Sequence, residues 1–181
     1  MKKGRFILGG YDTFYFFCCF VVAILTAGAS TSFAQKFSLD LDTYDGHFSE
    51  WTMDGLGGAT VLRATIKATR ASNHERWTPF LRVEVKTAKE SFGLLIHAPQ
   101  GRLPFQFFAV QRGGSAKRED RFGGTLDLNQ SADIELSWAA KGKLIVRIGD
   151  HTRELPLSEP ILGVQVISGT ANFVVQNIEV R

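Results

Sequence analysis

The stretch "SADIELSWAAKGKLIVRIGDHTRELPL", residues 131–157, contains two runs in which apolar and polar side chains alternate. One face of the two runs would carry Ile134, Leu136, Trp138, Leu144, Val146 and Ile148. A period of two residues is typical of a strand with one buried face. Lys141-Gly142 separates the runs and supplies a turn. The stretch therefore predicts an antiparallel hairpin and a short third strand, with Trp138 packed in the core.

The same alternation recurs along most of the chain. The expected strands are residues 37–42, 59–72, 79–87, 91–99, 103–112, 124–130, 161–169 and 172–181. Residues 43–54 read as a polar turn, and residues 112–121, "RGGSAKREDR", read as a basic loop at a hairpin tip. Turn signals about every ten residues, with no helical stripe, predict an all-β protein. The expected fold is an antiparallel β-sandwich or barrel of two sheets.

The N-terminus has the composition of an export signal. Lys2, Lys3 and Arg5 precede an apolar run, Phe14–Leu25, and Ser32-Phe33-Ala34 has the small-x-small form of a signal-peptidase site. Twelve apolar residues fit a signal sequence, whereas a membrane span takes about 20. We therefore expect a signal peptide over residues 1–34 and one domain over 35–181, in the periplasm or secreted. An uncleaved membrane anchor is the alternative.

Removal of residues 1–34 changes what the composition implies. The formal charge falls from +3 to +1, so the basic character belongs mostly to the leader. A nucleic-acid partner is disfavoured, because such domains carry clustered Lys and Arg. Both cysteines, Cys18 and Cys19, leave with the leader, which excludes disulfides, thiol nucleophiles and cysteine metal ligands from the mature chain. A membrane contact is expected only if the N-terminal segment is retained.

The two ends of the mature chain resemble the concanavalin A-like jelly rolls, the laminin-G and glucanase type. The resemblance rests on "ELSWAAKGKLIVRIGD" with "GVQVISGTANFVVQNIEVR", and on "FSLDLDTYDGHFSEW" at the start. It covers about the last 50 residues and the first 15 after the leader. It implies that the last strand pairs with the first. Because this fold hosts lectins and enzymes alike, it does not assign a function.

The catalytic patterns of the enzymes in this superfamily are incomplete here. The glucanases carry a Glu-x-Asp-x-x-Glu strand, and no such run occurs in this chain. The alginate-lyase-like members carry an Arg-x-Glu strand, which Arg82-Val83-Glu84 matches, and a Gln-x-His strand, of which only His97 is present. Their Tyr- and Lys-rich strand is missing, since Tyr44 is the only tyrosine after the leader. A non-catalytic module is therefore favoured over a glycoside hydrolase or lyase.

The sequence contains no zinc-binding pattern, because its four histidines lie far apart and no carboxylate spacing completes a site. No cofactor is expected. Structural calcium is an alternative for Asp40, Asp42, Asp45 and Gly46, although their spacing is not that of an EF-hand loop.

Strand phase assigns candidate ligand-binding residues. Arg63, Arg82, Glu84, His97 and Arg147 project opposite the core positions, so they would share one polar face if their strands belong to one sheet. Arginines around a glutamate suit an acidic sugar or another carboxylate, and a solvated face with weak ion pairs is the alternative. Trp51 and Trp77 stand in or beside turn-like segments and are candidates for stacking on a sugar ring. The predicted function is binding of a glycan or of an envelope protein partner.

The leader carries a direct test. Mass spectrometry of the exported protein should find Gln35 at the N-terminus, because Ala34 ends the cleavage motif. An intact Met1 in a membrane fraction would instead identify the segment as a retained anchor.

Overall fold

The computed structural model describes residues 36–44, 46–56, 58–72, 77–113 and 116–181. The expected signal peptide, residues 1–34, lies outside the described residues. Within the described part of the chain, no helix is long and apolar enough to cross a membrane.

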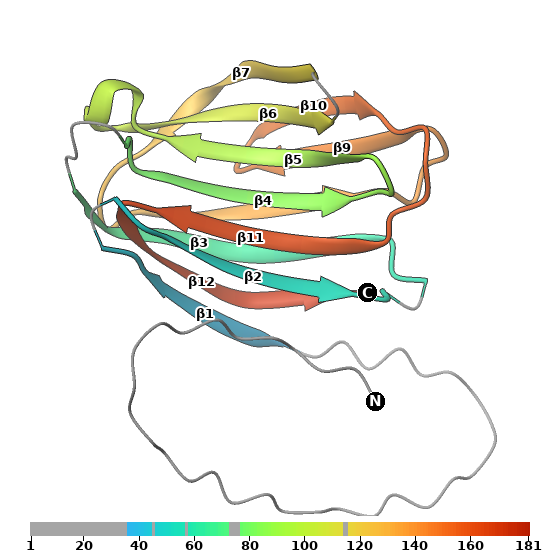
Figure 1. Cartoon of the computed structure of the whole chain (residues 1–181), viewed down its shortest axis with the longest axis horizontal. Coiled ribbons are helices and arrows are strands. Elements are labelled where there is room, and N and C mark those ends of the chain that lie inside the picture. The colour runs from blue at the N-terminus through green and yellow to red at the C-terminus, as the bar shows by residue number, and fades with distance from the viewer. Residues whose placement is uncertain (1–35, 45, 57, 73–76, 114–115) are drawn as a thin grey trace, which may run out of the picture. The chain divides into compact units, whose positions relative to one another are not determined.

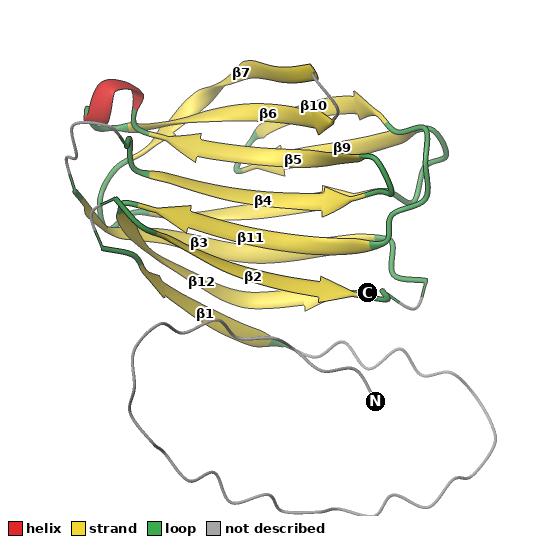
Figure 2. Cartoon of the chain, viewed as in Figure 1, coloured by secondary structure: helices red, strands yellow, loops and turns green. Residues whose placement is uncertain are grey.

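Twelve strands form two antiparallel sheets of six, which confirms the predicted β-sandwich (Figure 1). Sheet A has the order β1 (Phe37–Asp42), β12 (Ala171–Val180), β3 (Val61–Ala71), β8 (Ser131–Ser137), β9 (Lys143–Ile148) and β10 (His151–Pro156). Sheet B has the order β2 (Phe48–Asp54), β11 (Gly163–Gly169), β4 (Phe80–Lys86), β5 (Glu90–His97), β6 (Phe105–Gly113) and β7 (Ala116–Leu126). The one helical element described is a single 3₁₀ turn, Pro99–Gly101, drawn in red in Figure 2.

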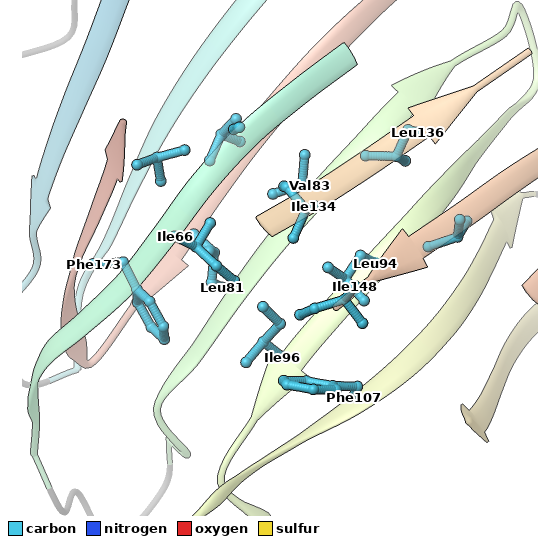
Figure 3. Close-up of a cluster of buried hydrophobic side chains, with 14 of the residues drawn as sticks. Ile66, Leu81, Val83, Leu94, Ile96, Phe107, Ile134, Leu136, Ile148 and Phe173 are labelled. Carbon is cyan, nitrogen blue, oxygen red and sulfur yellow. The ribbon is translucent and has the colours of Figure 1, made fainter. Parts of the chain in front are cut away.

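The predicted core positions face the space between the sheets. The alternating sets of β3, β4, β8 and β9 are buried, among them Ile66, Leu81, Leu136 and Ile148 (Figure 3). Full burial of such a side chain contributes about 1.5–3 kcal/mol. Strand β5 is buried on both faces over most of its length, as its apolar run predicted. Trp138 packs at the margin of this core, and its indole Nε1 donates a hydrogen bond to the carbonyl of Ala59 at 2.7 Å.

The predicted pairing of the chain ends is confirmed. Strand β12 pairs with β1 on one side and β3 on the other, while β11 pairs with β2 and β4. The chain passes from β11 in sheet B to β12 in sheet A through Thr170 alone, a buried residue with φ of 54°. Each of the last two strands is therefore an interior strand of its sheet.

Two segments differ from the sequence prediction. Residues 48–54 form edge strand β2 instead of continuing the turn after β1, because Phe48, Glu50 and Thr52 alternate with the inward Ser49, Trp51 and Met53. The second segment is the expected basic loop: its part from Ala116 onward belongs to edge strand β7. Charged side chains mask a strand signal where one face of an edge strand meets water.

Gly93 supplies a test of the packing of sheet B. It lies opposite Glu84 of β4 and Val110 of β6, and a Cβ at this position would collide with the backbone of Val83 and Glu84. We expect Gly93→Ala to lower the free energy of unfolding by about 1–3 kcal/mol, the usual cost of overpacking. Urea unfolding measures the difference, and Thr52→Ala on the exposed face of β2 is the control, with an effect under about 0.5 kcal/mol. A Gly93→Ala protein as stable as the wild type would contradict this packing.

Candidate functional site

The outward side chains of sheet B fall into cross-strand rows that the strand registers define. One row runs Phe48, Gly169, Phe80, His97 and Gln106. The next row runs Glu50, Ile167, Arg82, Leu95 and Phe108. A third row runs Thr52, Gln165, Glu84, Gly93 and Val110. We call this surface the outer face of sheet B.

A pocket of about 310 Å³ opens at one end of this face. Its lining consists of Gly46, His47, Phe48, Glu50, Trp77, Phe80, Arg82, Ile167 and Thr170. Trp77 is 54% exposed and Phe48 is 70% exposed, so both present aromatic rings to solvent. Such exposure of large apolar side chains next to one another is typical of an interaction site. We call this site the aromatic pocket.

Gly169 helps to shape the aromatic pocket. The ring of Phe80 occupies the space where a side chain at Gly169 would stand, so Phe80 reaches across β11. At the other end of the same strand, the Lys86–Asp54 ion pair, at 3.4 Å, lies beside Gly163. The two glycines of β11 therefore let side chains of the neighbouring strands lie over it.

Glu84 is a fully buried carboxylate beside this pocket. Its Oε2 accepts hydrogen bonds from Gln165 Nε2 at 2.8 Å and from Ser91 Oγ at 3.1 Å. Its Oε1 lies 3.5 Å from Arg112 Nε and 3.7 Å from Arg82 Nη1. Because these side chains cover it, Glu84 orients its neighbours and does not face solvent.

Arg82 connects Glu84 to the aromatic pocket, which it lines. Its guanidinium lies 5.5 Å from the centre of the Phe80 ring, within the range of a cation–π contact. Burial lowers the pKa of Arg82, and the charge of Glu84 partly offsets this effect. Arginine remains charged at any physiological pH, so the pocket contains a partly desolvated cation.

His97 occupies the row next to Arg82 and packs against Phe108, with ring centres 4.6 Å apart. Burial lowers the pKa of this imidazole below its ordinary value. Burial therefore favours the neutral imidazole, which can donate and accept hydrogen bonds.

The structure divides the predicted polar face between the two sheets. Arg82, Glu84 and His97 lie on sheet B, but Arg63 and Arg147 lie on β3 and β9 of sheet A. The condition for one shared face, that all five strands belong to one sheet, is therefore not met, because strand phase shows which way a side chain points but not which sheet holds it.

Arg63 and Arg147 face water on the opposite side of the sandwich. They flank Glu135 of β8, with Arg63 Nε at 2.6 Å and Arg147 Nη1 at 3.8 Å from its carboxylate. A pocket of about 370 Å³ lies beside them, lined by Lys36, Asp133 and Glu179 among others. About half of each arginine side chain is exposed, so these pairs contribute little to stability.

The two candidate tryptophans differ in position. Trp77 stands at the rim of the aromatic pocket, whereas Trp51 points inward from β2 and packs on Phe37, with ring centres 4.9 Å apart. The expectation that Trp51 is available for stacking is wrong, because it occupies an inward position of an edge strand that the sequence reading took for a turn.

Four residues of this face were missed at the sequence level: Phe48, Phe80, Arg112 and Gln165. Phe48 falls in the segment that the sequence predicts as a turn, and Arg112 falls where the expected strand 103–112 meets the expected loop 112–121. Phe80 and Gln165 have the outward phase of β4 and β11, and this phase was the available signal.

The calcium alternative finds no support among the described residues, where no three acidic or histidine side chains gather. Asp42 pairs with Arg70 at 2.6 Å, and Asp45 lies outside the described part of the chain.

No protein-family model matches the chain, and no curated protein matches it either. Solved structures with the same fold do match. Galectin LEC-6 of Caenorhabditis elegans is 15% identical, with a TM-score of 0.54 over 80% of this chain and 95% of its own. The carbohydrate-binding module CBM66 of Bacillus subtilis is 11% identical, with a TM-score of 0.54 over 80% of this chain and 89% of its own.

A GH16 protein of the Bacteroides ovatus mixed linkage glucan PUL, in complex with a product, is 9% identical. Its TM-score is 0.57, and the match covers 84% of both chains. These similarities confirm the predicted concanavalin A-like jelly roll at the level of the fold.

The Glu84 cluster supplies a test of stability. Glu84→Gln removes a buried charge and leaves Arg82 and Arg112 without their shared counter-ion. Breaking a buried pair costs about 3–5 kcal/mol, and the partial exposure of both arginines reduces this to about 2–3 kcal/mol. Urea unfolding of Glu84→Gln measures the loss, and Glu135→Gln in the exposed cluster of sheet A should lose less than about 1 kcal/mol. Equal effects of the two substitutions would contradict the role of Glu84 as a buried anchor.

Proposed function

We propose that the chain is an exported, non-catalytic module that binds a glycan in the aromatic pocket. The observation that carries this proposal is the exposure of Trp77 and Phe48 around a hollow that also contains Arg82 and Glu50. The electron-rich face of an aromatic ring attracts the C–H groups of a sugar, as it attracts other positively polarised edges. The arginine donates and the glutamate accepts hydrogen bonds, so the pocket complements the hydroxyl groups of a sugar.

The size of the pocket favours a glycan over an envelope protein as ligand. Small-molecule sites are concave, mostly apolar and about 300–1,000 Å³ in volume, with a few polar groups that fix orientation. The aromatic pocket has this volume and this composition. A stable protein interface covers about 800 Å² per partner and does not depend on one pocket.

The surroundings of the carboxylates favour binding over hydrolysis. Glu84 is buried, Asp54 pairs with Lys86, and Glu119 pairs with Arg112 at 2.8 Å. Glu50 lines the pocket and accepts a hydrogen bond from Thr52 Oγ1 at 3.3 Å. Acid–base hydrolysis uses two carboxylates that flank the scissile bond. Among the described residues that line the aromatic pocket, Glu50 is the only carboxylate.

The comparisons agree with a glycan ligand in general terms, because a galectin and a carbohydrate-binding module share the fold. Export fits the leader composition of residues 1–34.

Trp77 is the residue on which the test depends. The exported protein is screened on a glycan array, and the affinity for the best ligand is measured by titration calorimetry. We expect Trp77→Ala to weaken binding at least about tenfold, which corresponds to about 1.4 kcal/mol, because the aromatic platform is lost. Arg63→Gln on the opposite sheet is the matched control and should leave the affinity unchanged.

The same glycans are then incubated with the protein and assayed for new reducing ends or unsaturated products. Turnover that Glu50→Gln abolishes would show an enzyme and contradict the non-catalytic part of the proposal. Glycan binding that Trp77→Ala does not change would contradict the location of the site.

A further inference from the structure

Arg82 is the less tightly paired of the two arginines beside Glu84. Two arginines, Arg82 and Arg112, share its Oε1, while Oε2 is occupied by Gln165 and Ser91. Arg112 has a second and closer acceptor in Glu119, at 2.8 Å from its Nη2. Arg82 has the looser contact with Glu84, at 3.7 Å, and it also feels the charge of Glu50, which lines the same pocket.

Arg82 also has unused hydrogen-bonding capacity. A guanidinium carries five N–H donors in a planar fork. Arg82 Nε is buried and has no hydrogen-bond partner among the described residues. The side chain is 20% exposed and lines the aromatic pocket, so a molecule in the pocket would meet it. Burial also lowers its pKa, which indicates that the cation lacks full hydration.

We propose that the ligand is a carboxylated sugar and that Arg82 binds its carboxylate in the aromatic pocket. This inference rests on the proposed function. A carboxylate is planar and accepts two parallel hydrogen bonds from a guanidinium, which a hydroxyl group cannot do. Binding would supply an acceptor to a guanidinium whose buried Nε has none, and the interaction gains strength where water is excluded.

Glu50 determines the orientation of the sugar in this arrangement. It lies in the same row as Arg82, on the far side of Ile167. Its negative charge repels the ligand carboxylate and keeps it at the Arg82 end of the pocket. The hydroxyl groups of the sugar then face Glu50, which accepts their hydrogen bonds, and the ring lies against Trp77 or Phe48.

The test uses monosaccharides that share the glucose ring and differ in the group at C6. The full exported protein is titrated with glucuronate, with its methyl ester and with glucose 6-sulfate, and the Nε–H signal of Arg82 is followed by NMR. Arg82→Gln identifies that signal by its disappearance. We expect glucuronate to shift the signal in a saturable way, with at least tenfold weaker responses to the ester and the sulfate.

Paired oligosaccharides supply the affinities. The best carboxylated oligosaccharide is compared with its methyl-esterified form on wild type, Arg82→Gln, Arg82→Lys and Arg121→Gln. Arg82→Gln should weaken binding of the free acid at least tenfold and leave the ester within twofold, and Arg82→Lys should fall between them because it keeps the charge but loses the fork. Arg121→Gln removes an equal charge from edge strand β7 and should change neither. Circular dichroism verifies that each variant is folded.

The outcomes separate this inference from the proposed function. Equal binding of acid and ester, unaffected by Arg82→Gln but lost in Trp77→Ala, overturns the carboxylate assignment and leaves glycan binding in place. An equal response to the sulfate overturns the selectivity for carboxylate. A glucuronate response of Arg82 without any oligosaccharide binding would support the anion contact and refute the glycan-binding function.

Discussion

Both sheets depend on one buried turn at the end of the chain. Thr170 joins β11 of sheet B to β12 of sheet A, and its backbone N–H bonds to the carbonyl of His47 while its carbonyl accepts the N–H of Ser72. Edge strands β1 and β2 have no partner in the described sheets other than β12 and β11. Neither sheet can be completed before the C-terminal strands arrive. Folding therefore requires pairing between distant parts of the sequence, which is intrinsically slow.

The same constraint builds the aromatic pocket. The residues bonded to Thr170 belong to the segments that lead into β2 and out of β3, so the turn holds the side of the pocket formed by His47 and Phe48. Strand β11 lies between β2 and β4 in sheet B. Its glycines leave room for the ring of Phe80 and for the Lys86–Asp54 pair. The pocket therefore combines side chains of β2, β11 and β4 with His47 and Trp77 from the segments that precede β2 and β4.

Alternation of residues predicted the fold because it reports the burial of one strand face directly. It identified the inward sets of β3, β4, β8 and β9, for which Ile66 and Leu136 are examples. The alternation could not predict the site as a whole, because a repeat of two residues within one strand does not show which strands pair with one another. Arg63 and Arg82 have the same phase and lie on opposite sides of the molecule. Edge strands β2 and β7 were misread, because their charged and exposed side chains resemble those of turns.

Glu84 is a fully buried charged residue in a sheet whose other buried side chains are mostly apolar. A buried carboxylate costs desolvation energy that a well-packed apolar side chain would not, so its two hydrogen bonds and two guanidinium neighbours only offset a penalty. Well-packed apolar side chains in place of the whole cluster would satisfy the fold equally well, whereas an apolar residue at position 84 alone would leave Arg82 and Arg112 without an anchor on the sheet. Local departures of this kind concentrate where a protein binds or reacts. The position of Glu84 beside the aromatic pocket is therefore better explained by what it does for Arg82 than by what it contributes to stability.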